Sequence, residues 1–352
     1  MFMFRLVLDA MGGDYAPLQI VRGGILALKE FPEIFLYFVG DEEKIKPILD
    51  REASSLKGRY EIVHAPEEVA MNEPPSRVLK KRNSSLYVGA KLVREGKADA
   101  LVSAGNTGAV LAVGKFIIGA IEELERPSIG VAFPNPKGKT VLLDVGANVD
   151  VKPRHLVQFA VIGHTYAEEI LGIKNPRVGI LSIGEEEGKG NELVKETYPL
   201  LKETKLNFVG NAEGRDIFNG NFDVIVCDGF VGNVVLKASE SLGFAILKMI
   251  KEEVSRSFWA KLGALLMKPA LMTLKRKADF AEYGGIPLLG AKAPVMITHG
   301  RANAKAIRNA IKAAMDFYDH HFNDVLRENL KNLAGEVLNK TKNGNSNNSQ
   351  TP

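Results

Sequence analysis

The chain has 352 residues, of which 45% are hydrophobic and 25% are charged. These fractions are typical of a globular protein and argue against a disordered, collagen-like or membrane-spanning chain. Lys and Arg number 46 against 42 Asp and Glu, which is too even a balance to indicate a protein that binds nucleic acid. The single cysteine, Cys227, excludes an intramolecular disulfide and a thiolate-rich metal site, so we expect a cytoplasmic protein.

Short apolar runs alternate with longer amphipathic segments along the chain. The runs predict strands at residues 4–10, 34–40, 60–65, 98–104, 128–133, 139–146, 177–184, 206–210, 222–229 and 294–300. Helices are predicted at 18–31, 41–50, 84–95, 107–120 and 153–171. This alternation predicts a three-layer α/β/α fold with a mostly parallel sheet. We expect one catalytic unit, 1–337, and a disordered polar tail, 338–352.

Six loops that follow these strands share Gly and small polar residues. They are Asp9–Asp14, Ser103–Gly108, Asp144–Asp150, Ser182–Asn191, Asp228–Asn233 and Thr298–Asn303. Ligands of open α/β sheets bind at the carboxyl ends of strands, where helix N-termini favour anions, so the set predicts an anion pocket. Any one loop alone is more simply a strand-to-helix turn. Lys189 lies beside three carboxylates, and two interpretations stay open: contact with phosphate, or a solvated salt-bridged loop.

Other motifs have simpler explanations. Gly138–Thr140 and Gly184–Gly190 both depart from the P-loop pattern, and no dinucleotide-binding fingerprint follows the first strand. Cys227 falls within an apolar run, which predicts a structural role. Among the histidines, His299 alone follows a predicted strand in a candidate loop and is a possible acid or base.

The segment Val254–Lys277 has six Lys or Arg and no acid, and it holds the only Trp of the chain. One helical side is predicted to gather Phe258, Trp259, Leu262, Leu265, Leu266 and Met267. Pro269 is predicted to break the helix. An apolar face beside cations suits an anionic membrane surface, whereas a dimerisation or core helix explains the same pattern.

In chain order, DAMGGDYAP, SAGNTGA, DVGANVD, LSIGEEEGKGNE, GFVGNVVLK and HGRAN resemble the motifs of the phosphate acyltransferases of bacterial phospholipid synthesis, over residues 4–330. The resemblance implies conversion of long-chain acyl-acyl-carrier-protein and inorganic phosphate to acyl-phosphate and free carrier protein. It also implies a homodimer, a fold similar to isocitrate and isopropylmalate dehydrogenases and to phosphotransacetylase, and peripheral membrane association. The partner implied downstream is an acyl-phosphate:glycerol-3-phosphate acyltransferase.

Phosphate is already a nucleophile at neutral pH, so such an enzyme chiefly holds it against the thioester and stabilises the oxyanion. The loops and the resemblance together give Lys189 the role of cation near phosphate or oxyanion and Asn233 that of amide donor. Further substrate contacts are expected from Gly12, Gly13, Asp14, Asn106, Thr107, Asn148, Gly232 and Arg301. We expect neither a cofactor nor a metal.

Three alternatives stay open. A short-chain phosphotransacetylase using coenzyme A is chemically close but leaves the segment Val254–Lys277 unexplained. A decarboxylating dehydrogenase of the same fold would use Asp9, Asp144 and Asp228 to bind magnesium beside a nicotinamide cofactor. A non-catalytic, membrane-surface lipid-binding scaffold would leave the six loops without a role. The sequence does not divide acid and base duties among Asp144, Asp228 and His299.

Overall fold

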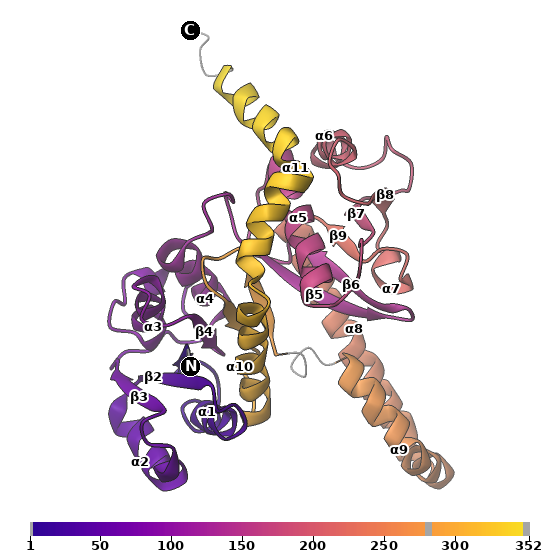
Figure 1. The fold of residues 1–352 in the computed structure, drawn as a ribbon. Coiled ribbons are helices and arrows are strands. Elements are labelled where there is room, and N and C mark those ends of the chain that lie inside the picture. The colour runs from indigo at the N-terminus through magenta and orange to yellow at the C-terminus, as the bar shows by residue number, and fades with distance from the viewer. Residues whose placement is uncertain (1–2, 279–283, 348–352) are drawn as a thin grey trace.

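The structure, a computed structural model, describes residues 3–278 and 284–347. Two lobes share one continuous sheet (Figure 1). In the described residues this sheet has eleven strands, in the order β3-β2-β1-β4-β11-β10-β5-β6-β9-β7-β8. The strands are β1 Phe4–Asp9, β2 Ile34–Gly40, β3 Tyr60–His64, β4 Ala100–Ser103, β5 Ser128–Asn135, β6 Gly138–Leu143, β7 Val178–Leu181, β8 Phe208–Ala212, β9 Val224–Val226, β10 Ile286–Leu289 and β11 Val295–Ile297.

Helices cover both faces of the sheet, as the alternating pattern predicts. They are α1 Leu18–Glu30, α2 Glu42–Glu52, α3 Ser85–Arg94, α4 Thr107–Val113, α5 Pro153–Glu169, α6 Glu192–Lys202, α7 Asp216–Asn219, α8 Gly229–Arg256, α9 Phe258–Ala278, α10 Ala304–Asp319 and α11 Phe322–Asn347, with short turns η1 Ser54–Leu56, η2 Pro75–Leu79 and η3 Gly114–Ile118. One buried cluster joins the sheet to α1, α2, α5, α6, α10 and α11, and a second joins it to α3, α4, α7 and the start of α8. The three-layer α/β/α prediction is therefore confirmed.

The sheet consists of two parallel blocks that run in opposite directions. β1, β2, β3, β4 and β11 are mutually parallel, and so are β6, β7, β8 and β9. The blocks meet through antiparallel pairings of β10 with β11, β10 with β5 and β5 with β6. β10 was not predicted from the sequence, because four residues containing Pro287 show no periodicity.

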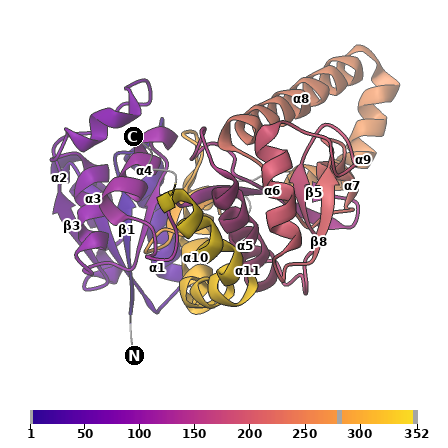
Figure 2. The same ribbon diagram turned by 90° about the horizontal axis from the view of Figure 1, so that it is seen from above.

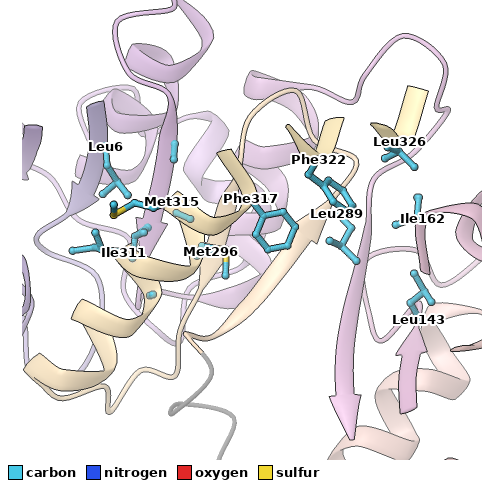
Figure 3. Close-up of a cluster of buried hydrophobic side chains, with 14 of the residues drawn as sticks. Leu6, Leu143, Ile162, Leu289, Met296, Ile311, Met315, Phe317, Phe322 and Leu326 are labelled. Atoms are coloured by element: carbon cyan, nitrogen blue, oxygen red, sulfur yellow. The ribbon is translucent and has the colours of Figure 1, made fainter. Parts of the chain in front are cut away.

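The junction of the two lobes is filled by helices from the C-terminal part of the chain. Figure 3 shows a row of buried side chains that crosses the junction from Leu6 in β1 to Leu143 in β6. Between them stand Met315 and Phe317 of α10 and Phe322 of α11. Burial of this apolar surface, worth about 25 cal/mol per Å², joins the lobes into one unit.

α8 and α9 project from the second lobe as a helical pair (Figure 2), which we call the hairpin. α9 runs through Pro269 to Ala278, so the helix break predicted there is wrong. A proline inside a helix removes one backbone hydrogen bond, and at an exposed position that loss bends a helix without having to end it. By length and composition, α8 is the one described helix that suffices to cross a membrane; its first turns are, however, packed into the body at Gly229, Gly232 and Leu236.

The C-terminal tail differs from the prediction for 338–352. α11 continues to Asn347, and residues 348–352 lie outside the described residues. Val337 and Leu338 are buried in the core, and Lys340 Nζ lies 3.2 Å from Glu203 Oε2 on the loop after α6. These anchors hold a polar sequence in a helix that its composition alone would not predict.

Candidate active site

The glycine-rich loops after β1 and β4 bind each other. Ser103 Oγ donates to the buried Asp9 Oδ2 at 2.6 Å and accepts from the Gly105 N–H at 3.0 Å. A methyl group on Gly12 would lie 2.5 Å from Asp9 Oδ2 and 2.8 Å from Gly105 N, so only glycine permits this approach. Burial raises the pKa of Asp9, against the opposing effect of its hydrogen bonds. Gly12 is thus a packing position between two loops.

The loop after β11 joins this pair. The Asp14 N–H donates to the Gly300 carbonyl at 2.7 Å, and Arg301 Nε lies 3.6 Å from Asp14 Oδ2. Gly13 has φ +108°, and a methyl group on it would lie 3.0 Å from the same Gly300 oxygen. The structure therefore brings together Gly12, Gly13, Asp14 and Arg301, which the sequence could only place in separate loops.

Asn106 uses its side chain to organise the protein. Its Oδ1 accepts from the Ala109 N–H at 3.1 Å, which caps α4, and its Nδ2 donates to the carbonyls of Met71 and Glu73, both at 3.0 Å. The carboxamide predicted to contact substrate is thereby engaged within the protein. Thr107, the next residue, lines the main cavity described below.

In the second lobe, Asp144 organises the loop that follows β6. Its carboxylate accepts from the N–H groups of Ile129, Ala147 and Asn148 and from Asn148 Nδ2 at 2.6–3.1 Å. Burial raises the pKa of Asp144, while these donors favour the charged form. Asn148 Nδ2 also donates to the Pro127 carbonyl at 2.8 Å. Asp144 and Asn148 are consequently bound to each other and to their own loop.

The start of α8 packs closely on this loop. Asp228 caps the helix by accepting from the Val231 N–H at 2.9 Å. A methyl group on Gly232 would lie 1.9 Å from the Asp144 carbonyl oxygen, so this turn of the helix touches backbone directly. The side chain of Asn233 lies over Gly146, where a methyl group would be 3.5 Å from it. Gly232 thus allows the approach that places Asn233 over the loop.

A cavity of about 590 Å³ lies between the two lobes and is lined by residues from both. Its polar lining includes Thr107, Asn233, Lys237, Glu240, Thr298, His299, Arg301 and Asn303. Its apolar lining includes Leu111, Ile129, Val145, Leu236, Ile286 and Ile297. The Thr298 hydroxyl is buried and has no hydrogen-bond partner among the described residues. The cavity combines a polar side with an apolar wall, the arrangement of a small-molecule site.

Lys189 lies outside the described lining of this cavity. Its side chain is exposed, and its loop borders a second cavity of about 280 Å³ that Ser182, Asn191 and Asp228 line. Val231 lines the second cavity and Asn233 the first, so the first turns of α8 separate the two. Four of the six predicted loops thus supply residues that line one cavity, Asp9–Asp14 packs on two of those four, and the Lys189 loop lies beside the cavity.

Two residues near the site were not singled out from the sequence. Lys115 is partly buried with Nζ 3.4 Å from Asn148 Oδ1, and desolvation lowers its pKa. Thr298 is the first residue of a candidate loop, and its position directly after a strand could have identified it from the sequence. Lys115 lies in η3, within a stretch predicted to be helical, and nothing in the sequence there indicates a site.

Cys227 has the structural surroundings that its apolar run predicts. It is buried, and burial raises the pKa of its thiol well above the usual value, with the charges of Asp144 and Asp228 adding to the effect. Among residues 3–278 and 284–347, no group of three His, Cys, Asp or Glu side chains is placed to hold a metal. The carboxylates of Asp9, Asp144 and Asp228 are instead hydrogen-bonded in three separate loops.

Comparison with known proteins identifies the family of the chain. Residues 4–325 match the family model described as a fatty acid synthesis protein. The phosphate acyltransferase of Aquifex aeolicus is 74% identical over 334 residues, covering 95% of this chain and 99% of the relative. That of Pelotomaculum thermopropionicum is 51% identical, covering 94% and 96%.

Solved structures give the fold. A EutD phosphotransacetylase from Staphylococcus aureus aligns with a TM-score of 0.57 at 18% identity, covering 89% of this chain and 94% of its own. A branched-chain phosphotransacylase from Enterococcus faecalis aligns with a TM-score of 0.54 at 16% identity, covering 89% and 98%. At such identities the likeness establishes architecture alone, whereas the close relatives extend over nearly the whole sequence. The chain belongs to the phosphate acyltransferase family.

Proposed function

We propose that the 590 Å³ cavity holds inorganic phosphate at its polar side and the acyl group of a long-chain acyl carrier protein along its apolar wall. A phosphate oxygen attacks the thioester carbonyl carbon, and the carbonyl becomes an oxyanion. The C–S bond then breaks, the sulfur leaves as a thiolate that takes up a proton, and acyl-phosphate remains. The observation that carries this proposal is the junction of polar loops and an apolar wall in one cavity.

The chain's contribution is to place donors where negative charge gathers. Asn233 faces the cavity from the first turns of α8, and its carboxamide N–H can donate to the oxyanion or to phosphate. Arg301, which is largely exposed beside Asp14, supplies a cation at the same side. Lys189 is assigned to phosphate or oxyanion from the neighbouring loop, an assignment supported by its exposed ammonium group and the family motif around it.

The test is phosphate-dependent release of free thiol from palmitoyl acyl carrier protein, without added metal or nucleotide. We expect Asn233→Ala and Lys189→Ala each to lower kcat/KM by about 100-fold or more. Lys195→Ala, an exposed lysine on the adjacent α6, is the matched control and should retain full turnover. Absence of thiol release by the unaltered chain would contradict the function, and normal turnover of Lys189→Ala would remove that residue from the site.

The hairpin supports a second part of the proposal, which is peripheral attachment to an anionic membrane. Phe258, Trp259 and Leu266 expose 73%, 77% and 77% of their surface, and Leu262 and Leu265 are exposed beside them. The segment Val254–Lys277 carries no acid, so cations flank the apolar side chains. The product is amphiphilic, and a membrane surface is where a downstream acyl-phosphate:glycerol-3-phosphate acyltransferase would receive it.

The same hairpin supports a homodimer. On α8, Leu242, Phe244 and Met249 expose 62%, 82% and 63% of their surface, and nothing within the described chain covers them. Exposed apolar area of this kind is typical of an interface.

Two measurements test these parts of the proposal. Trp259→Glu with Leu266→Glu should release the protein from anionic vesicles while thiol release continues. Light scattering should give the mass of two chains for the unaltered protein. Unchanged vesicle binding by the double variant would contradict the membrane attachment, and the mass of a single chain would contradict the homodimer.

A further inference from the structure

Beside the cavity, residues 70–82 form a short segment that we call the roof. The carboxamide of Asn106, at the start of α4, donates to the roof carbonyls of Met71 and Glu73 at 3.0 Å each. A methyl group on Gly108, which lines the cavity, would lie 2.4 Å from Pro75. One on Gly300, between the lining residues His299 and Arg301, would lie 2.8 Å from Met71. The roof therefore packs on two of the loops that form the catalytic cavity.

The roof is also held rigidly from beneath. Val78 is fully buried in the core cluster that includes α3 and α4. Lys81 Nζ lies 2.6 Å from Glu73 Oε1 and 2.9 Å from the Glu68 carbonyl, which closes the segment on itself. Glu73 in turn accepts from the Ala70 N–H at 3.2 Å. Side chains on the outer side of the roof thus have a fixed position relative to the cavity.

That outer side is strongly basic. Between Pro74 and Arg82 the chain has four Lys or Arg and no Asp or Glu, and the one acid of the roof, Glu73, is paired with Lys81. Arg77, Lys80 and Arg82 are exposed and, unlike Lys81, take part in no ion pair with a described residue. Met71, 44% exposed, adds an apolar contact at the cavity side of the same segment. Three exposed cations next to an apolar side chain form a surface that an acidic protein would complement.

We propose that the roof is the docking surface for the acidic carrier protein, with Arg77, Lys80 and Arg82 contacting its carboxylates. This inference rests on the proposed function, because it is the thioester substrate that must be delivered to the cavity. An acyl thioester on a flexible arm needs its carrier beside the cavity and not within it. The roof meets that requirement, since it packs on the cavity loops but leaves its cations exposed.

The experiment compares two acyl donors that carry the same acyl chain: acyl carrier protein and acyl-pantetheine, which has no protein part. The variant is the triple charge reversal Arg77→Glu, Lys80→Glu and Arg82→Glu. Its KM for acyl carrier protein should rise about tenfold or more, because attraction becomes repulsion at the encounter surface. Its KM for phosphate and its kinetics with acyl-pantetheine should stay unchanged. High salt screens these charges, so it should reduce the difference in KM for acyl carrier protein between the variant and the unaltered protein.

A matched control reverses the charge of Lys57, Arg94 and Lys331, three exposed cations, of which the first two precede β3 and β4 at the opposite edge of the sheet. The control should retain the KM for acyl carrier protein. An equal rise in both triple variants would overturn the proposal in favour of a general charge effect, and no rise in the roof variant would overturn it outright. If the unaltered chain used neither donor, the proposed function itself would fail, which is a different result.

Discussion

The loops of the two lobes, which we call the body, bury polar side chains, whereas the hairpin exposes apolar ones. In the body, polar groups such as Asp9 and Asp144 are buried and hydrogen-bonded, and glycines let the backbones touch. In the hairpin, large apolar side chains such as Phe244 and Trp259 are exposed and touch little of their own chain. α8 belongs to both regions, with Gly232 fitted against Asp144 and Phe244 facing outward.

This difference in burial matches two different roles, a binding site in the body and an association surface on the hairpin. A site that positions phosphate needs donors fixed in place, and a closely packed network fixes them. A surface that meets a membrane or a second chain needs apolar area left free. Substitutions in the body should accordingly change folding stability, whereas substitutions in the hairpin should change association and leave stability nearly untouched.

The largest effect on stability is expected within α8 itself. Gly232→Ala should lower the free energy of unfolding by about 3 kcal/mol or more, because its methyl group would lie 1.9 Å from the Asp144 carbonyl oxygen. Gly243→Ala is the matched control, since nothing lies within 4 Å of the methyl position there. It should gain about 0.5–1 kcal/mol from helix propensity. Urea unfolding measures both, and similar values would erase the contrast between the two ends of the helix.

A smaller loss is expected from the polar pair in the first lobe. Ser103→Ala leaves Asp9 Oδ2 and the Gly105 N–H without this partner and should cost about 1–3 kcal/mol. It should also lower kcat/KM, because the loop after β4 lines the cavity at Thr107 and Gly108. Ser55→Ala, at an exposed position, should change neither quantity. A fully stable Ser103→Ala protein would mean that the two loops are held together by other contacts.

The raised pKa of Asp9 predicts that the free energy of unfolding depends on pH. The stability contributed by the protonated carboxyl is complete below the unfolded pKa of 3.8 and is lost as the pH rises through the folded pKa. The Asp9→Asn variant has no carboxyl to titrate at this position. As the pH rises from 3.8 through the folded pKa of Asp9, its free energy of unfolding should therefore fall less than that of the unaltered protein. Unfolding followed over a pH series gives the comparison, and parallel curves would contradict it.

The smallest effect is expected in the hairpin. Trp259→Glu with Leu266→Glu should change the free energy of unfolding by no more than about 0.5 kcal/mol, since both side chains are already 77% exposed. Leu236→Glu, in the buried first turns of α8, provides the contrast and should be severely destabilising because it places a charge in the core. Thermal unfolding at low protein concentration distinguishes them. A large loss in the hairpin variant would show that these side chains stabilise the folded chain.

Most of the fold could be predicted because its strands are apolar runs with amphipathic helices between them. β10 was missed because it is short and contains Pro287. The helical end of the chain was missed because Val337 and Leu338 stabilise it through contacts with distant residues. At the site, the composition of the loops identified Asn233 and Thr107, both of which line the cavity. It did not reveal that the Asn106 carboxamide is engaged with Met71 and Glu73.

The sequence by itself determined the α/β alternation, the glycine-rich loops and their order, and a basic apolar segment without acids. These are local properties, since periodicity and turn chemistry act over a few residues. Only the tertiary structure decided that the two parallel blocks run in opposite directions, that Asn233 lines the main cavity while the loop of Lys189 borders another, and that the roof packs on two of the cavity loops. Those relations depend on contacts between residues far apart in the chain, which no local pattern encodes.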